Sequence, residues 1–346
     1  MTKSTEKYNL LVYEEALPYA ADYLRKNNLA YKVISSDDDI PANEKNIIYK
    51  VNKGKFLTPC PGTPKYICCG YYVLAPVENC PFSCTYCILN AYFKNRDIVV
   101  YVNTDDMIKE LSTIGEKSVK RIGTGEFSDS LAITATRLYL KNTLDFFSNH
   151  KEIFLELKTK SSFIPQEFLS KLYENIIFSW SLNSNKITES EEHDTASISE
   201  RITSAKKMTE RGYRVSFHFD PIIYYDGWEK DYHQTINEIF SHIKDSHIVW
   251  ISLGTLRFIP QLKDIATSLY PKTTIFDDEF IKALDGKSRY FRKRRVAIYK
   301  RMLSMIREHS KDVFVYLCME NEDVWQEVFS VNMTTKRLKE LMDERL

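Results

Sequence analysis

Three cysteines within eight residues constrain this chain more than any other feature. Cys80, Cys84 and Cys87 follow the pattern CxxxCxxC. Iron–sulfur clusters require thiolate ligands, and a short loop can bring three of them to one corner of a cubic cluster. Because the loop has no fourth cysteine, one iron would remain open. The loop therefore predicts a [4Fe–4S] centre. A zinc site and a disulfide are the alternatives, although zinc usually takes four ligands in separated pairs and no second pair follows.

The composition indicates a globular protein without a strong charge preference. The 346 residues are 43% hydrophobic and 13% aromatic, enough for one large domain or two. The net charge of +1 neither requires nor excludes nucleic acid. Seven cysteines with uneven spacing suit a reducing compartment and metal ligation. Since no signal-like or membrane-spanning apolar run is evident, we expect a cytoplasmic protein with no membrane contact.

Short apolar runs alternate with amphipathic stretches from residue 71 onward, which predicts a parallel sheet covered by helices. Six strands are expected, at 71–75, 119–123, 153–158, 176–182, 214–219 and 248–253, with helices at 104–115, 131–148, 165–174, 198–211 and 230–243. The expected fold class is α/β. The expected domains are an α/β cap with its connector (1–70), a barrel (71–260) and a mostly helical C-terminal extension (261–346). Residues 36–70 are expected to form turns and extended segments.

Polar residues follow several of these strands, at the ends where such a barrel places its chemistry. Gly123 and Gly125 would let the backbone approach a ligand closely, and the carboxylate of Glu126 would accept hydrogen bonds from an ammonium group. A turn with a solvated glutamate is the alternative. Further candidates are Ser128, Lys160, Ser181, Asn183, Tyr86 in the cysteine loop, and Arg201, which would reach a carboxylate bidentately or be an ordinary exposed arginine.

The loop resembles that of the radical S-adenosylmethionine (SAM) superfamily, in which the open iron binds SAM. A broader set of segments resembles spore photoproduct lyase and its relatives, nearly from end to end. These segments are 80–90, 123–130, Lys158-Thr159-Lys160, Ser181-Leu182-Asn183, Arg211-Gly212-Tyr213, Asp220-Pro221-Ile222, 225–228 and 316–325.

This resemblance implies a partial (β/α)6 barrel and an enzyme that cleaves SAM to a 5′-deoxyadenosyl radical with a [4Fe–4S] cluster. The family's founding members use the radical to break a methylene-bridged thymine dimer in DNA. By resemblance, Cys80, Cys84 and Cys87 ligate the cluster, and residues such as Lys160 and Ser181 line the SAM and substrate pocket. An electron donor of the flavodoxin or ferredoxin type is expected.

One departure concerns the thiol that returns a hydrogen atom to the repaired thymine. Glu126 stands at its position, before Phe127-Ser128-Asp129. A carboxyl O–H bond is too strong to donate a hydrogen atom to a carbon radical, so Glu126 is better interpreted as a SAM ligand. The alternatives are therefore a radical SAM enzyme acting on tRNA, a peptide or a small metabolite, and a non-catalytic nucleic-acid-binding protein with a structural metal.

Two further features leave alternatives open. The stretch Lys287–Arg295 interleaves cations with aromatic residues, a pattern suited to phosphate contacts and stacking on DNA; a solvated helix face is the alternative. Cys60, Cys68, Cys69 and Cys318 are interpreted as small buried residues, with a second cluster on the first three as the alternative.

Overall fold

The computed structural model describes residues 7–60, 62, 65–114 and 119–346, which form two compact units. Unit 1 comprises 1–59, 71–81 and 93–176, and unit 2 comprises 60–70, 82–92 and 177–346. The predicted division at residues 70 and 260 remains a prediction. Pro61, Pro64 and the predicted helix end at 115 lie outside the described residues. None of the described helices is long and apolar enough to cross a membrane.

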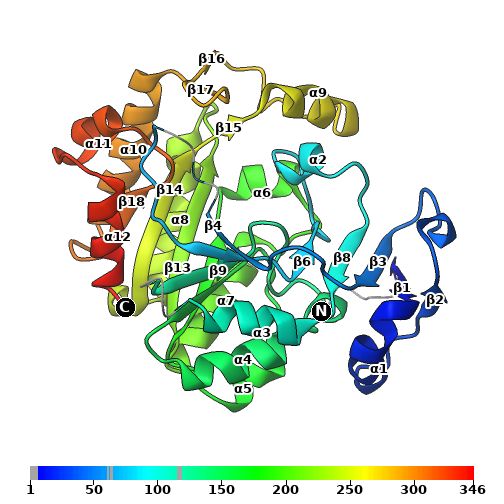
Figure 1. Ribbon diagram of the computed structural model, residues 1–346. Coiled ribbons are helices and arrows are strands. Elements are labelled where there is room, and N and C mark those ends of the chain that lie inside the picture. The colour runs from blue at the N-terminus through cyan, green and yellow to red at the C-terminus, as the bar shows by residue number, and fades with distance from the viewer. Residues whose placement is uncertain (1–6, 61, 63–64, 115–118) are drawn as a thin grey trace. The chain divides into compact units, whose positions relative to one another are not determined.

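Unit 1 contains a mixed sheet in the order β2-β1-β3-β8-β6, drawn in blue and cyan in Figure 1. Its strands are β1 (Asn9–Tyr13), β2 (Lys32–Ile34), β3 (Asn46–Lys50), β6 (Val77–Glu78) and β8 (Ile98–Tyr101). β3 is parallel to both β1 and β8, and four of its five residues are buried. The extended segments expected within 36–70 thus include a central strand, which the apolar run Ile47–Tyr49 supplies.

Unit 1 also contains the strand order β10-β9-β5-β4. These strands are β4 (Leu57–Pro59), β5 (Tyr72–Leu74), β9 (Arg121–Thr124) and β10 (Phe154–Thr159). β5, β9 and β10 are parallel, as predicted, whereas β4 is an unpredicted antiparallel neighbour of β5. The helical segments of unit 1 are η2 (Glu14–Ala16), α1 (Leu17–Lys26), η3 (Asp37–Asp39), α3 (Thr104–Ser112), η5 (Thr134–Thr136), α4 (Leu140–Asn149) and α5 (Gln166–Ser170).

The predicted helix 131–148 begins nine residues late, at Leu140 of α4. In the segment before α4, side chains take a backbone carbonyl that a helix would use. Thr136 Oγ1 donates to Ile133 O at 3.0 Å, and Arg137 Nε donates to the same oxygen at 3.2 Å. Such local hydrogen bonds favour turns over helix, and only the short η5 forms there. The apolar spacing alone did not reveal this competition.

Unit 2 contains the parallel order β18-β14-β13-β11, with β11 (Ile176–Ser181), β13 (Arg214–Ile222), β14 (Ile248–Thr255) and β18 (Val315–Leu317). Its small strands are β7 (Ser83–Cys84), β12 (Glu192–His193), β15 (Arg257–Phe258), β16 (Phe280–Lys282) and β17 (Ser288–Tyr290). The last three form an antiparallel sheet. The region after residue 260 is therefore less purely helical than expected.

Helices cover the long strands of unit 2, with α7 against β13 and α10 against β14 (Figure 1). The helical segments are α2 (Leu89–Tyr92), α6 (Asn185–Glu191), α7 (Ile198–Glu210), α8 (Trp228–His242), η6 (Asp245–His247), α9 (Pro260–Leu269), α10 (Arg292–Arg307), α11 (Glu322–Phe329) and α12 (Thr335–Asp343). A Ser197–Glu200 capping box starts α7. Gly212, with φ of 90°, ends it as predicted.

Candidate functional site

The predicted glycines of unit 1 lie where the backbone passes close to other side chains. A Cβ at Gly123 would stand 2.7 Å from the Tyr71 ring. Gly125 has φ of 101°, and a Cβ there would stand 2.8 Å from Lys158 Cβ. The segment after β9 therefore requires glycine at both positions, because of contacts within the protein.

Glu126 belongs to a group that we call the Glu126 triad: Tyr71, Glu126 and Lys158. Lys158 Nζ lies 2.6 Å from Glu126 Oε1 and 2.9 Å from the Tyr71 hydroxyl, and the Tyr71 hydroxyl donates to the same carboxylate oxygen. The Glu126 side chain is 34% exposed and that of Lys158 16%. The carboxylate thus already holds one ammonium group, and it remains accessible to a ligand.

Next to this triad, Asp129 is buried among hydrogen-bond donors. Leu131 N and Thr159 Oγ1 donate to Oδ1 at 2.9 and 2.8 Å, and Lys160 N donates to Oδ2 at 2.7 Å. Burial nevertheless raises the pKa of the Asp129 carboxyl above its usual value, against the effect of these donors. Asp129 therefore fixes the turn to the end of β10. The Lys160 backbone contributes to this turn, and its side chain is half-buried.

Ser128 is the candidate in unit 1 that best fits a ligand. Its side chain lines a small pocket with Thr124, Gly125, Asp129 and Tyr139 among others. The Ser128 hydroxyl is buried and has no hydrogen-bond partner among the residues that the structure describes. Since buried hydroxyls are normally hydrogen-bonded, this one is suited to a polar group of a bound molecule.

Unit 2 contains a second group of the same composition, the Glu192 triad: Tyr86, Glu192 and Arg201. Arg201 Nη2 lies 2.7 Å from Glu192 Oε2, and both side chains are 0% exposed. The Tyr86 hydroxyl donates to Glu192 Oε1. Burial and the nearby carboxylate raise the pKa of Tyr86 well above 10. Sequence reasoning missed Glu192, because it sits in an acidic run that looks solvated.

The remaining donors of Arg201 are also used inside unit 2. They reach Ala196 O at 2.9 Å, Ser181 O at 2.8 Å and Thr195 Oγ1 at 2.7 Å. The alternative that Arg201 is an ordinary exposed arginine is thus wrong, because its guanidinium is buried and engaged within the protein. A contact between Arg201 and SAM stays a prediction. Ser181 contributes its carbonyl to this arrangement, and its side chain is half-buried.

Asn183 is likewise occupied within unit 2. Its Nδ2 donates to Pro221 O at 3.0 Å, and the Tyr232 hydroxyl donates to its Oδ1. Thr235 Oγ1 adds a bond to the Asn183 carbonyl at 3.1 Å. The side chain is fully buried. Its contacts favour a structural role at the end of β11 over contact with a ligand.

The cysteine loop is anchored at several points. Within unit 2, Cys84 pairs with Glu192 through β7 and β12, Thr85 N donates to Glu191 O at 2.8 Å, and Asn90 Nδ2 donates to Cys84 O at 3.0 Å. Within unit 1, Cys80 N donates to Asn79 Oδ1 at 3.0 Å. Glu192 therefore holds the loop through both its backbone and its carboxylate.

The donor chemistry of the loop fits an iron–sulfur cluster. None of the three cysteines is in a disulfide with another described residue; Cys84 is buried, and Cys80 and Cys87 are partly exposed. Among the described residues, no three His, Cys, Asp or Glu side chains are already arranged as a metal site. Three thiols in one short loop, with no carboxylate or imidazole beside them in the sequence, are the ligand type that such clusters take.

The basic stretch is not the free cationic surface that its sequence suggested. Arg289 and Arg295 are buried and pair with Asp285 at 2.6 Å and Glu320 at 2.9 Å. Arg294 pairs with Asp278 and lies over the Tyr224 ring. The exposed Arg292 pairs with Asp323 at 2.8 Å and Glu327 at 3.2 Å. Acids outside the stretch thus compensate four of its arginines, and all of these acids except Asp285 are distant in sequence from the arginine that they pair with.

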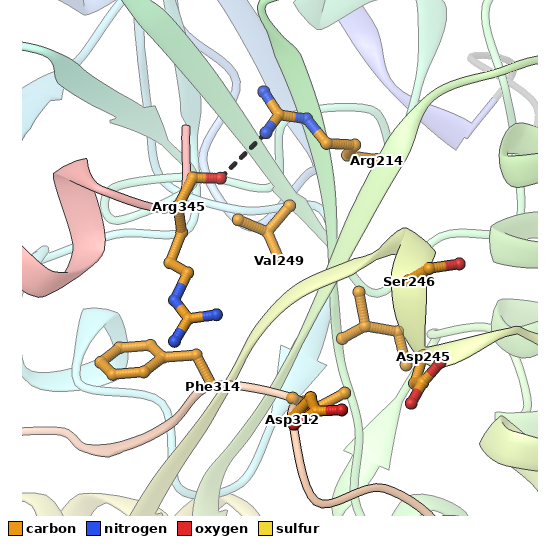
Figure 2. Close-up of a pocket in the computed structure, with 9 residues that line it drawn as sticks. Arg214, Asp245, Ser246, Val249, Asp312, Phe314 and Arg345 are labelled. Atoms are coloured by element: carbon orange, nitrogen blue, oxygen red, sulfur yellow. Dashed lines mark hydrogen bonds between the residues drawn. The ribbon is translucent and has the colours of Figure 1, made fainter.

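A larger pocket of unit 2 lies elsewhere, at the amino ends of β13 and β14 (Figure 2). Its volume is about 330 Å³. Arg214 crosses it to donate to Arg345 O at 3.0 Å, and Arg345 extends over the Phe314 ring. None of the predicted site residues lines this pocket. Since parallel barrels place chemistry at the carboxyl ends of strands, it is not the candidate site.

Solved structures share the fold. A spore photoproduct lyase complexed with dinucleoside spore photoproduct has a TM-score of 0.76 at 21% identity, over 90% of this chain and 98% of that one. A mutant with bound AdoMet and the same dinucleoside has a TM-score of 0.77 at 20% identity, with the same coverage. SuiB of Streptococcus suis, bound to SAM, has a TM-score of 0.52 at 14% identity, over 76% of this chain and 53% of that one. The predicted fold class, an α/β partial barrel, is confirmed.

Sequence comparisons identify the family. The spore photoproduct lyase family model matches residues 45–317. Spore photoproduct lyase of Clostridium acetobutylicum is 25% identical over 63% of this chain and 66% of its own length. The corresponding protein of a Geobacillus species is 27% identical, over 60% and 63%. The chain thus aligns with just under two thirds of the length of each of these curated relatives.

The fold and the cysteine loop define a protein of the radical SAM class. This chain belongs to the spore photoproduct lyase family. Members of that family are radical SAM lyases that use a [4Fe–4S] cluster and SAM. The predicted family is therefore confirmed, and the predicted enzyme class and cofactors are those of its members.

Proposed function

We propose that this chain cleaves SAM reductively to a 5′-deoxyadenosyl radical and acts on a DNA photolesion or a nucleobase-like substrate. The observation that carries the proposal is the CxxxCxxC spacing of the three loop cysteines inside the segment matched by the family. Cys80, Cys84 and Cys87 would hold the cluster. When bound, the cluster supplies the electron that splits SAM.

The chain's own residues would position these groups. The Glu192 triad and the β7–β12 pairing fix the part of the loop that carries Cys84 and Tyr86. The unpartnered hydroxyl of Ser128 supports a hydrogen bond to bound SAM. The partly exposed carboxylate of Glu126 would face SAM's amino group beside Lys158. Lys160 and Ser181 remain candidates for contacts with SAM or substrate.

A second candidate is a radical SAM reaction on a tRNA, a peptide or a small metabolite. The observation that favours it is Glu126 at the position where the resemblance expects a donor thiol, held by Tyr71 and Lys158. A carboxyl group so placed cannot return a hydrogen atom to a carbon radical. Lesion repair by this chain would therefore need another donor.

Anaerobic reconstitution with iron and sulfide tests both candidates. We expect about four irons per chain and 5′-deoxyadenosine after addition of SAM and dithionite. Cys84→Ala should lose both, whereas the matched control Cys60→Ala should keep both. Reversal of dinucleoside spore photoproduct to the intact dinucleoside supports the first candidate. Deoxyadenosine formation without reversal favours the second, and wild-type protein that holds zinc or no metal at the loop refutes both.

A further inference from the structure

The four cysteines outside the loop gather at one place in unit 2. Cys60, Cys68 and Cys69 lie in the segment 60–70, and Cys318 follows β18. An antiparallel bridge joins the two segments, with Ile67 N donating to Glu320 O at 2.8 Å. Cys69 lies two residues after one end of this bridge, and Cys318 two residues before the other. The thiols of Cys68 and Cys69 are close enough to Cys318 to influence its pKa.

Cys60 and Cys68 are in direct contact within this group. The Cys68 thiol is hydrogen-bonded to both Cys60 and Cys69: the bond with Cys60 raises the pKa of Cys68, the bond with Cys69 lowers it, and the pKa is raised overall. Cys68 Sγ lies against the turn that begins at Cys60: Gly62 N donates to Cys60 O at 2.6 Å, and a Cβ at Gly62 would stand 3.2 Å from Cys68 Sγ. Both thiols are partly exposed, so a small reagent can reach them.

The other two thiols are less reactive toward such a reagent, although Cys318 is partly exposed like Cys60 and Cys68. Cys69 is buried. Burial raises the pKa of Cys318 well above 9, and Arg257 Nη2 donates to its sulfur at 3.6 Å. Protonated, buried thiols are poor nucleophiles. The reactive pair of the group is thus Cys60 and Cys68.

This convergence is not expected of cysteines that only fill space. Cys68 interacts with both Cys60 and Cys69, and Cys68 and Cys69 lie close enough to Cys318 to influence its pKa, although the four residues span positions 60 to 318. We propose that Cys60 and Cys68 form a reversible disulfide, a redox-sensitive site independent of the cysteine loop.

The reaction with a small disulfide balances without other reagents. The Cys60 thiolate attacks one sulfur of oxidised glutathione, which releases one glutathione thiolate and leaves a mixed disulfide on Cys60. Cys68 loses its proton to solvent and attacks the Cys60 sulfur, which releases the second glutathione. Two protein thiols are oxidised, and one glutathione disulfide is reduced to two thiols. An added dithiol reverses both steps.

The test uses full-length protein purified anaerobically and exposed to oxidised glutathione. Free thiols are then blocked, and a protease that cuts after Tyr66 and Tyr71 separates Cys68 from the loop cysteines. Mass spectrometry should find a Cys60–Cys68 linked peptide that dithiothreitol removes. Cys68→Ser should instead accumulate glutathione on Cys60, because the resolving thiol is absent. The matched control, Cys69→Ser, should form the same linked peptide as the wild type.

The proposal would be overturned if the wild type gave no linked peptide, or if the bridge joined another pair such as Cys69 and Cys318. It would also be overturned if bound zinc or iron kept the thiols unreactive. Elemental analysis of protein in which all three loop cysteines are alanine measures such metal. A wild type that forms the bridge but makes no deoxyadenosine would refute the proposed function and leave this one intact.

Discussion

Each unit holds one tyrosine, one glutamate and one cation in contact, yet the two groups differ in burial. In the Glu192 triad the carboxylate and guanidinium are 0% exposed. In the Glu126 triad the carboxylate is 34% exposed and the ammonium 16%. The same chemistry therefore occurs once inside the protein and once within reach of a ligand.

Burial changes what such a group can do. A fully buried ion pair has lost its hydration, so removing one partner leaves a charge that nothing compensates. A partly exposed pair keeps water nearby and contributes little to stability. The comparison assigns the Glu192 triad to holding the loop and the Glu126 triad to binding. Both assignments can be tested, and refuted, by experiment.

The largest effect is expected from Glu192→Ala. It leaves the buried Arg201 guanidinium without its counter-ion and removes the acceptor of the Tyr86 hydroxyl. The free energy of unfolding should fall by about 3–5 kcal/mol, measured by urea denaturation. The free energy of unfolding should fall less in Glu192→Gln, which retains an acceptor for the Tyr86 hydroxyl. A loss below about 1 kcal/mol for the alanine variant would mean that the buried triad does not hold the unit together.

A similar loss is expected from Arg295→Ala, which extends the comparison to the basic stretch. Arg295 is buried against Glu320, whereas Arg292 is about half exposed beside Asp323 and Glu327. Arg295→Ala should destabilise by about 3–5 kcal/mol, and Arg292→Ala by less than about 1 kcal/mol. Equal losses in urea denaturation would contradict this distinction. Weaker DNA binding by correctly folded Arg292→Ala would restore the nucleic-acid interpretation of the stretch.

Much of the fold could be predicted because its signals are local. Apolar runs such as Ile248–Leu253 are long enough to mark buried parallel strands, and Gly212 marks a helix end. β3 was missed because its short apolar run lies among turn residues. The late start of α4 was missed because hydrogen bonds of Thr136 and Arg137 override the apolar spacing.

The candidate site was only partly predictable, because ion pairing depends on residues far apart in sequence. The spacing of the three loop cysteines alone predicts an iron–sulfur cluster, and the family match is consistent with that prediction. The partner of Arg201 was hidden in an acidic run, and that of Glu126 is a lysine from the next strand. Charge in a sequence indicates neither burial nor compensation, and this is why the ion pairs of the basic stretch could not be predicted.

A smaller effect, on binding more than on stability, is expected from Glu126→Gln. The variant leaves the Lys158 ammonium without its carboxylate beside the site proposed for SAM. SAM should bind the reconstituted enzyme about tenfold more weakly, ~1.4 kcal/mol, while unfolding changes by less than about 1 kcal/mol. Lys158→Met is the matched variant: it frees the carboxylate, and SAM should bind at least as tightly as to the wild type. Unchanged SAM affinity in Glu126→Gln would remove Glu126 from the site.

The smallest effect concerns pH and a third carboxylate, Asp129, which is buried among hydrogen-bond donors. Burial raises the pKa of the Asp129 carboxyl in the folded state above 3.8, the ordinary value for aspartate. Between the unfolded and folded pKa values, the folded state binds more protons, so stability from this group decreases as pH rises. The wild type should therefore lose part of its advantage over Asp129→Asn as pH increases from about 4 to 7, measured as the difference in their urea unfolding free energies. A difference that grows with pH would mean that the donors outweigh burial and hold Asp129 ionised.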